Sequence, residues 1–281
     1  MEYVIDHDLH IHSKLSLCSR DPEQTPENIL KYGIENGYSS ICLTDHFWDE
    51  RVPVYNIEGS GYSKQNSAYI SQSLPLPKAP GIEFLFGGEC DMDKYDRIGI
   101  SPEFLKKMDF LIVPITHLHI DNFSVDSRIV PIERWKIPDD EQYIKIMSIL
   151  WVKRFRALLD ADLPFKKVGI AHLQWFNFHS DMTSAKTLDL ISDVDLNDLF
   201  SRAAEKGAGI ELNFDELNMD ENAKPSVYRI FEAAKTNGCK LYFGSDAHHP
   251  GEFVHAKENF TKIAGRLALS EDDKFHIDRN A

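Results

Sequence analysis

The hydrophobic positions of this chain gather into short runs that alternate with segments of helical periodicity. The runs are apolar and bounded by Gly, Pro and Asp, which is typical of strands buried on both faces of a parallel sheet. We predict strands at residues 3–12, 39–46, 83–90, 110–119, 167–173, 208–214 and 239–248. Strands that alternate with helices imply parallel pairing through right-handed crossovers. Seven such units predict a closed or nearly closed barrel, with an open doubly wound sheet as the alternative.

Helix boundaries follow from capping residues between the predicted strands. Thr25 and Ser101 each precede a proline, so each is expected to cap a helix that begins with that proline. Gly37, Gly207 and Gly238 are expected to end helices. Further helices are expected over 141–160, 195–206, 225–237 and 252–267.

Six of the predicted strands carry a residue of metal-ligand type at or near their carboxyl ends. Successive side chains of a strand alternate between its faces, so His10 and His12 share one face, as do Asp246 and His248. The motifs are Asp8-Leu9-His10-Ile11-His12-Ser13, Thr44-Asp45-His46, Gly87-Gly88-Glu89, Thr116-His117, Ala171-His172 and Gly244-Ser245-Asp246-Ala247-His248. A barrel of this class keeps its active site at the carboxyl ends of its strands, so the sequence predicts one ring of ligands there.

Two connections are long, at residues 47–82 and 120–140. They follow the second and fourth predicted strands, so both should lie over the ligand ring as functional lids. Barrels of about this length commonly form one domain, and we expect residues 1–281 to be a single domain.

The composition of the chain limits which classes of binding partner are expected. The formal charge is −14 and no basic run appears, which argues against a nucleic-acid polymer as partner. No apolar run is long enough for a membrane span, and no targeting segment is visible. The four cysteines form no CxxC pair, which favours a reducing compartment. We therefore expect a cytoplasmic protein without membrane association, and leave its oligomeric state open.

The order of these motifs resembles the polymerase and histidinol phosphatase (PHP) family, from Asp8 to His248. The resemblance implies a distorted, TIM-like (β/α)7 barrel with the active site at the carboxyl ends of its strands. It also implies two or three divalent metals (Zn, Mn or Fe) and hydrolysis of phosphoesters. The implied ligands are His10, His12, Glu89 and Asp246 for a first metal, Glu89 with His117 and His172 for a second, and His46 and His248 for a third.

Two positions leave alternatives open. Cys18 stands where the family often has a histidine. It is either a thiolate ligand of the third metal or a packed thiol beside a weak site, and Asp21 could also reach in. His119 shares a strand face with His117 and is the alternative ligand there.

Metal ions bridged by a carboxylate lower the pKa of a water and neutralise phosphate oxygens, so no protein nucleophile is needed. The catalytic candidates are Glu89, Asp246 and His248. Asp8 and Asp45 are expected to accept from the outer nitrogens of the ligand imidazoles, and Glu211 to orient a ligand or fill the barrel. Candidates for substrate binding lie in the rim loops, although such charges are also common on plain surfaces: Lys14, Arg20, Arg128 and His179.

The sequence thus predicts a metal-dependent hydrolase of a small phosphomonoester, such as histidinol phosphate or a nucleotide-like phosphate. One alternative is an amidohydrolase-type enzyme acting on a non-phosphate substrate. That superfamily typically has a lysine where the fourth strand here ends in His117. The other alternative is a non-catalytic metal-binding barrel, which should have lost more ligands.

Overall fold

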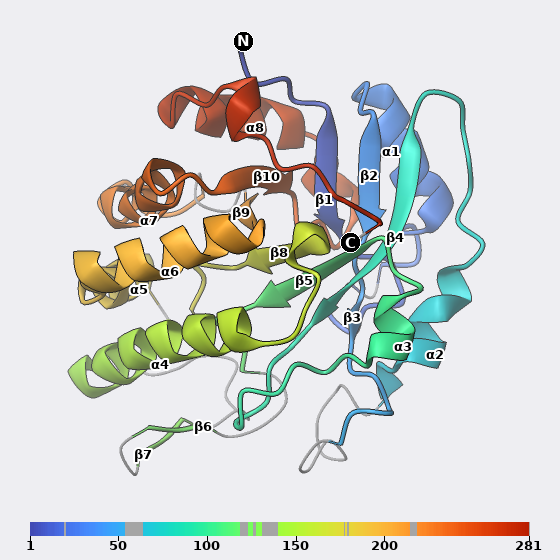
Figure 1. Ribbon diagram of the computed structural model, residues 1–281. Coiled ribbons are helices and arrows are strands. Elements are labelled where there is room, and N and C mark those ends of the chain that lie inside the picture. The colour runs from blue at the N-terminus through green and yellow to red at the C-terminus, as the bar shows by residue number, and fades with distance from the viewer. Residues whose placement is uncertain are drawn as a thin grey trace.

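A parallel sheet curls into a nearly closed barrel at the centre of the computed structural model, with helices around it (Figure 1). The structure describes residues 1–19, 21–53, 64–118, 123–125, 128–130, 140–176, 178, 180–213 and 218–280. The predicted TIM-like α/β barrel is therefore confirmed, and the open doubly wound sheet is excluded.

The barrel strands follow one another around the sheet in chain order. They are β1 (His7–Ile11), β2 (Ser40–Leu43), β4 (Glu83–Cys90), β5 (Phe110–Pro114), β8 (Val168–Ala171), β9 (Gly209–Asn213) and β10 (Lys240–Gly244). The short β3 (His46–Phe47) continues the line of β2 and also pairs with β4. Every pairing between them is parallel, and β1, β5, β8 and β9 are buried along their whole length.

The first and last strands meet near their carboxyl ends. The amide of His12 donates to the carbonyl of Ala247 at 3.0 Å, and the amide of Asp246 donates to the carbonyl of His10 at 2.8 Å. These bonds join β1 to the segment after β10, so the first and last ligand motifs are held together by backbone.

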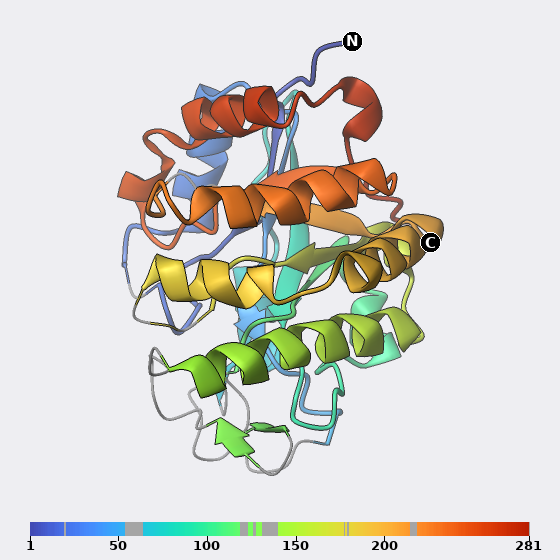
Figure 2. The same cartoon turned by 90° about the vertical axis from the view of Figure 1, so that its left-hand side faces the viewer.

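Helices cover the outside of the sheet: α1 (Pro26–Glu35), α2 (Ser67–Ile70), α3 (Pro102–Leu105), α4 (Glu141–Asp160), α5 (Asp181–Asp189), α6 (Asp193–Lys206), α7 (Lys224–Thr236) and α8 (Ala256–Arg266). Thr25 and Ser101 cap α1 and α3 as predicted, and Gly207 ends α6 with φ of 79°. Figure 2 shows α8, α7, then α5 and α6, and finally α4 arranged from top to bottom over one side of the barrel.

Helix α5 was not predicted. Its buried face is made of Thr183, Ser184, Ala185 and Thr187 with Leu188. Small and hydroxyl side chains can pack against a neighbour without producing an apolar stripe, so the helix left no hydrophobic period to read.

The two long connections are described only in part. The segment 47–82 contributes the end of β3, helix α2 and a 3-10 turn at Ser71–Ser73, while 54–63 lie outside the described residues. The segment 120–140 contributes an antiparallel ribbon of β6 (Phe123–Val125) and β7 (Arg128–Val130). Their role as lids and the single-domain organisation stay predictions. Among the described residues, no helix is long and apolar enough to cross a membrane.

The C-terminal segment covers the amino ends of the barrel strands. Phe275, 5% exposed, packs beside Phe110 and Tyr242 in the barrel interior. Its amide donates to the carbonyl of Leu241 at 2.9 Å. The barrel therefore has a hydrophobic floor at the end opposite the ligand ring.

We predict that Phe275→Ala destabilises the chain by about 3–5 kcal/mol, because it empties a buried aromatic site in the barrel floor. Chemical denaturation measures the loss, and Val254→Ala, at a position 71% exposed, is the control. Metal content should stay unchanged, since the floor lies at the opposite end from the ligands. If Phe275→Ala unfolded at the same denaturant concentration as wild type, Phe275 would not stabilise the barrel floor.

Candidate metal centre

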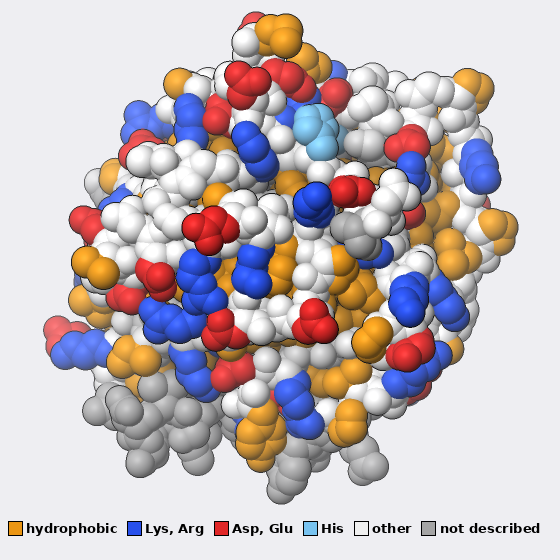
Figure 3. Space-filling view, in the orientation of Figure 1, with side chains coloured by type: hydrophobic (Ala, Val, Ile, Leu, Met, Phe, Trp, Pro, Cys, Tyr) orange, Lys and Arg blue, Asp and Glu red, His pale blue; other side chains and the backbone are white. Residues whose placement is uncertain are grey.

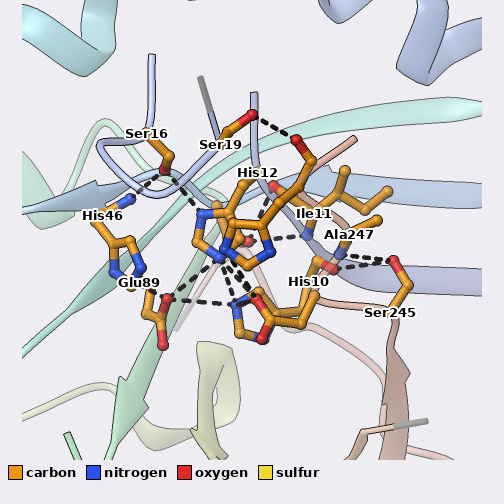
Figure 4. A network of polar contacts seen from close by, with 12 residues as sticks. His10, Ile11, His12, Ser16, Ser19, His46, Glu89, Ser245 and Ala247 are labelled. Atoms are coloured by element: carbon orange, nitrogen blue, oxygen red, sulfur yellow. Dashed lines mark hydrogen bonds and ion pairs between the residues drawn. The ribbon is translucent and has the colours of Figure 1, made fainter. Parts of the chain in front are cut away.

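The ligand residues predicted from the strand ends converge on one point at the carboxyl end of the barrel. Figure 4 shows His10, His12, His46 and Glu89 pointing toward one another. Their donor atoms fall into overlapping groups in which all donors lie within 4.8 Å of one another. These groups are His10, His12, Glu89 and Asp246; His46, Glu89 and His117; His12, Cys18, His46 and His248; and His10, His172 and Glu211.

The first donor group has the dimensions of a metal site. The Nε2 atoms of His10 and His12 are 3.1 Å apart. Glu89 Oε2 is 3.4 Å from the former and 3.3 Å from the latter, and Asp246 Oδ1 is 3.3 Å and 2.9 Å from them. Ligands bound tetrahedrally at about 2.0–2.2 Å lie roughly 3.3 Å from one another. The four side chains therefore fit a single divalent cation.

Glu89 occupies the centre of the ring. Its side chain is fully buried, and neither carboxylate oxygen accepts a hydrogen bond within the described part of the chain. Oε2 lies 3.0 Å from Nδ1 of His46, in addition to the contacts with His10 and His12. Oε1 faces the other side, 3.3 Å from Nε2 of His172 and 3.5 Å from Nδ1 of His117. Its two oxygens thus face two separate sets of imidazoles, as a bridging ligand would.

The pKa shifts of the ligand residues show that the buried carboxylates are stabilised by nearby positive charge. Burial alone would raise the pKa of Glu89, but His46, His10 and His117 hold it well below its usual value. Burial would likewise lower the pKa of His172, but Asp246 and Glu89 raise it to about 9. Both shifts arise because imidazoles and carboxylates are packed against one another. Divalent metals could take the place of a proton on such an imidazole, because imidazole binds metal only when neutral.

Two ligand residues sit on strained backbone. His172 and Asp246, each just past the end of its strand, have φ of 54° and 53°. Non-glycine residues in this left-handed region cost on the order of 1–3 kcal/mol, and such strain persists where surrounding bonds fix it. The strain turns Asp246 inward, so that Oδ1 faces His10 and His12 while Oδ2 lies 3.6 Å from Nε2 of His172.

Outer contacts fix the orientation of several imidazoles. His10 Nδ1 lies 2.5 Å from Oε1 of Glu211, and His12 Nδ1 lies 2.8 Å from Oγ of Ser16. Asp91 differs from these contacts because it faces the inner side of a ring: its Oδ1 is 3.4 Å from Nδ1 of His117, the same nitrogen that lies 3.5 Å from Oε1 of Glu89. Asp91 was missed in the sequence, although it lies two residues after Glu89 and so shares its strand face.

The expected role of Asp8 and Asp45 was wrong. Asp45 accepts from the amide and hydroxyl of Ser13, both at 2.6 Å. Asp8 accepts from the hydroxyl of Tyr32 at 2.8 Å and the amide of Ser245 at 2.9 Å, and burial raises the pKa of Asp8 to about 6. These carboxylates tie the loops around the ring together rather than orienting its imidazoles.

The third donor group combines three imidazoles with the thiol of Cys18. The rings of His46 and His248 stack on that of His12, with centroids 4.6 Å and 4.4 Å apart. Burial lowers the pKa of His248 to about 4, even though Asp246 opposes the shift. His248 is therefore neutral at neutral pH. Cys18 is exposed as a residue, but burial of its thiol and the nearby carboxylates of Asp246 and Glu89 raise the pKa of that thiol. The choice between a ligand and a packed thiol stays a prediction.

The rim residues proposed for substrate binding are less well defined. Lys14 lies in the loop after β1 with an exposed side chain. Arg20, His119 and His179, and the side chain of Arg128, fall outside the described residues. Trp175 was not singled out from the sequence. It is 40% exposed, and its ring meets that of His117 edge-on at 5.4 Å between centroids.

Comparisons with known proteins support the fold. No protein-family model and no curated protein matches the sequence. The chain is similar to the crystal structure of a histidinol phosphate phosphatase from Lactococcus lactis, complexed with zinc, L-histidinol and phosphate. The two share 15% sequence identity over 96% of this chain and 98% of that one, with a TM-score of 0.62.

Other similar structures are more distant. A triazine hydrolase variant shares 10% identity over 92% of this chain and 59% of its own, with a TM-score of 0.42. A dihydropteroate synthase from Xanthomonas albilineans shares 13% identity over 92% of this chain and 95% of its own, with a TM-score of 0.38. The ring of His, Glu and Asp donors on this barrel fits a metal-dependent hydrolase.

We predict that Asp246→Asn weakens zinc binding by about 100-fold or more, since changes to outer contacts of a metal ligand already cost about 10–100-fold. The amide keeps the shape of the side chain but removes its charge. Zinc titration against a chelating dye measures the affinity, and circular dichroism confirms the fold. Asp189→Asn, at an exposed position on α5, is the matched control. Equal zinc affinity in all three proteins would remove Asp246 from the site.

Proposed function

We propose that this protein is a metal-dependent phosphomonoesterase. The observation that carries the proposal is the placement of Glu89, whose two buried oxygens face two different sets of imidazoles. His10, His12 and Asp246 with Glu89 would hold one metal, and His117 and His172 with Glu89 a second.

Bound divalent metals would activate a water as the attacking group and neutralise phosphate oxygens during hydrolysis. The chain itself supplies position and charge. Glu89 would fix the spacing of the two metals. Asp246 would add a second carboxylate, which lies between His12 and His172. His248, partly exposed and neutral, is placed to accept a proton from the substrate side or to serve as a further ligand.

A small substrate is supported by several observations. The Lactococcus lactis structure, which binds L-histidinol and phosphate, has the same barrel over almost its whole length. Trp175 offers an exposed ring beside His117, where the organic part of a phosphomonoester would lie. Histidinol phosphate and nucleotide-like phosphates both have a flat ring that could stack on or beside an aromatic side chain. We keep both as candidates.

Surface charge favours a small substrate over a nucleic-acid polymer. Figure 3 shows basic and acidic side chains interleaved over one face, and the formal charge of the chain is −14. Tight binding of a polymer would require a basic surface that displaces counterions. A cytoplasmic location and the absence of membrane association remain part of the proposal.

We predict that metal-stripped protein is inactive and that added Mn²⁺, Zn²⁺ or Fe²⁺ restores hydrolysis of a phosphomonoester without a covalent phosphoenzyme. The reason is that a carboxylate-bridged pair of metals needs no protein nucleophile. A panel of phosphomonoesters, assayed for released phosphate, measures the activity, and acid quenching tests for a phosphorylated residue. Lactone or amide hydrolysis without phosphatase activity would favour the amidohydrolase alternative. Trapping a phosphoenzyme would contradict the mechanism.

We also propose that Cys18 is a ligand of a third metal, with His46 and His248. Its thiol lies within 4.8 Å of donor atoms of both residues and of His12. A thiolate is a good ligand for zinc and is deprotonated outright by the metal. An exposed cysteine held against three imidazoles has the donor set of such a site.

We predict that Cys18→Ser lowers the number of metals bound at saturation and lowers activity with it. Metal counting by elemental analysis after gel filtration gives the measurement. Cys239→Ala is the control, because its buried thiol bonds the carbonyl of Phe200 away from the ring. Equal metal counts in wild type and Cys18→Ser would discard the ligand role, whatever happens to the melting temperature.

A further inference from the structure

Glu211 lies directly behind the ligand ring, on β9 and 1% exposed. Its two carboxylate oxygens have different partners. Oε1 lies 2.5 Å from Nδ1 of His10, and Oε2 accepts from the backbone amide of His172 at 3.1 Å. One buried side chain therefore contacts a residue of each proposed metal site.

The contact with His10 decides which ring nitrogen faces the metal. A carboxylate oxygen that accepts from Nδ1 of His10 places the imidazole proton on that nitrogen. That leaves the lone pair on Nε2, the atom that lies 3.1 Å from Nε2 of His12 and 3.3 Å from Oδ1 of Asp246. A carboxylate behind a ligand imidazole also makes that imidazole a stronger donor to metal.

The contact with His172 acts on the backbone. His172 has φ of 54°, a conformation that needs external bonds to persist. Glu211 holds the amide of this same residue, so it helps to fix the turn that aims the His172 ring at Oε1 of Glu89.

The neighbouring strand is shaped around these contacts. Gly244, at the end of β10, packs against the Glu211–His10 pair. A β-carbon at this position would lie 2.4 Å from Oε1 of Glu211 and 2.5 Å from Cβ of His10. Because both separations are far below van der Waals contact, any larger residue at 244 would displace the pair.

We propose that Glu211 is a positioning residue that orients His10 and His172 together and so couples the two metal sites. The role requires two acceptor atoms on one side chain. Glutamine has a single acceptor oxygen and a donor amide, so it can accept from Nδ1 of His10 or from the amide of His172 but not from both. Aspartate also has two acceptor oxygens, but its side chain is one methylene shorter, so it would not span the distance between His10 and His172. The inference rests on the proposed metal centre, and its test does not depend on phosphatase activity.

The test compares Glu211→Gln with wild type and with Glu232→Gln, a matched change at an exposed position on α7. Zinc affinity is measured by competition with a chelator, zinc content at saturation by elemental analysis, and stability by melting of the metal-free proteins. We expect Glu211→Gln to bind zinc about 10–100-fold more weakly while its saturated zinc content equals that of wild type. Glu232→Gln should match wild type in both respects.

Two outcomes would overturn the proposal. Unchanged zinc affinity would show that Glu211 only fills the barrel. Loss of a bound zinc at saturation would show that Glu211 is itself a ligand, as its grouping with His10 and His172 allows. Should Glu211→Gln fail to fold, nitrogen NMR of zinc-loaded wild type decides the matter. The proposal requires the proton of His10 on Nδ1, and a proton on Nε2 would contradict it.

Discussion

The carboxylate of Glu89 is the constraint on which the rest of this structure depends. A fully buried carboxylate, which accepts no hydrogen bond from the described residues, is among the costliest groups that a protein interior can hold. The chain compensates by surrounding it with imidazoles from β1, β3 and the segments after β5 and β8. These imidazoles hold the pKa of Glu89 well below its usual value, and divalent metals would supply positive charge at the same place.

The barrel supplies the positions that this arrangement requires. Parallel strands bring residues that are distant in the chain to one edge, and the bonds between β1 and the segment after β10 close the ring. The hydrophobic floor around Phe275 fills the opposite end of the barrel. Strain at His172 and Asp246 is then held by Glu211 and by the carbonyl of His10. Fold stability and ligand geometry are thus coupled through a few backbone bonds.

Much of this could be predicted from the sequence, because period-two alternation places residues on strand faces without any tertiary information. This alternation predicted the positions of the barrel strands and predicted that His10, His12 and Asp246 lie close together. It did not locate α5, whose buried Thr and Ser residues leave no apolar stripe. Asp8 and Asp45 were assigned to the wrong partners because proximity in sequence does not tell which nitrogen a carboxylate faces. Those contacts, like Glu211 with His10, depend on strands that are far apart in the chain.

The most direct test of the central claim is anomalous diffraction from crystals of metal-loaded protein, with data collected on both sides of the zinc edge. The account predicts that two of the anomalous peaks lie about 2.0–2.2 Å from Glu89, each bonded to a different one of its oxygens. One peak should also touch His10, His12 and Asp246, and the other His117 and His172. Crystals grown in saturating zinc without a peak bonded to Glu89 would contradict it.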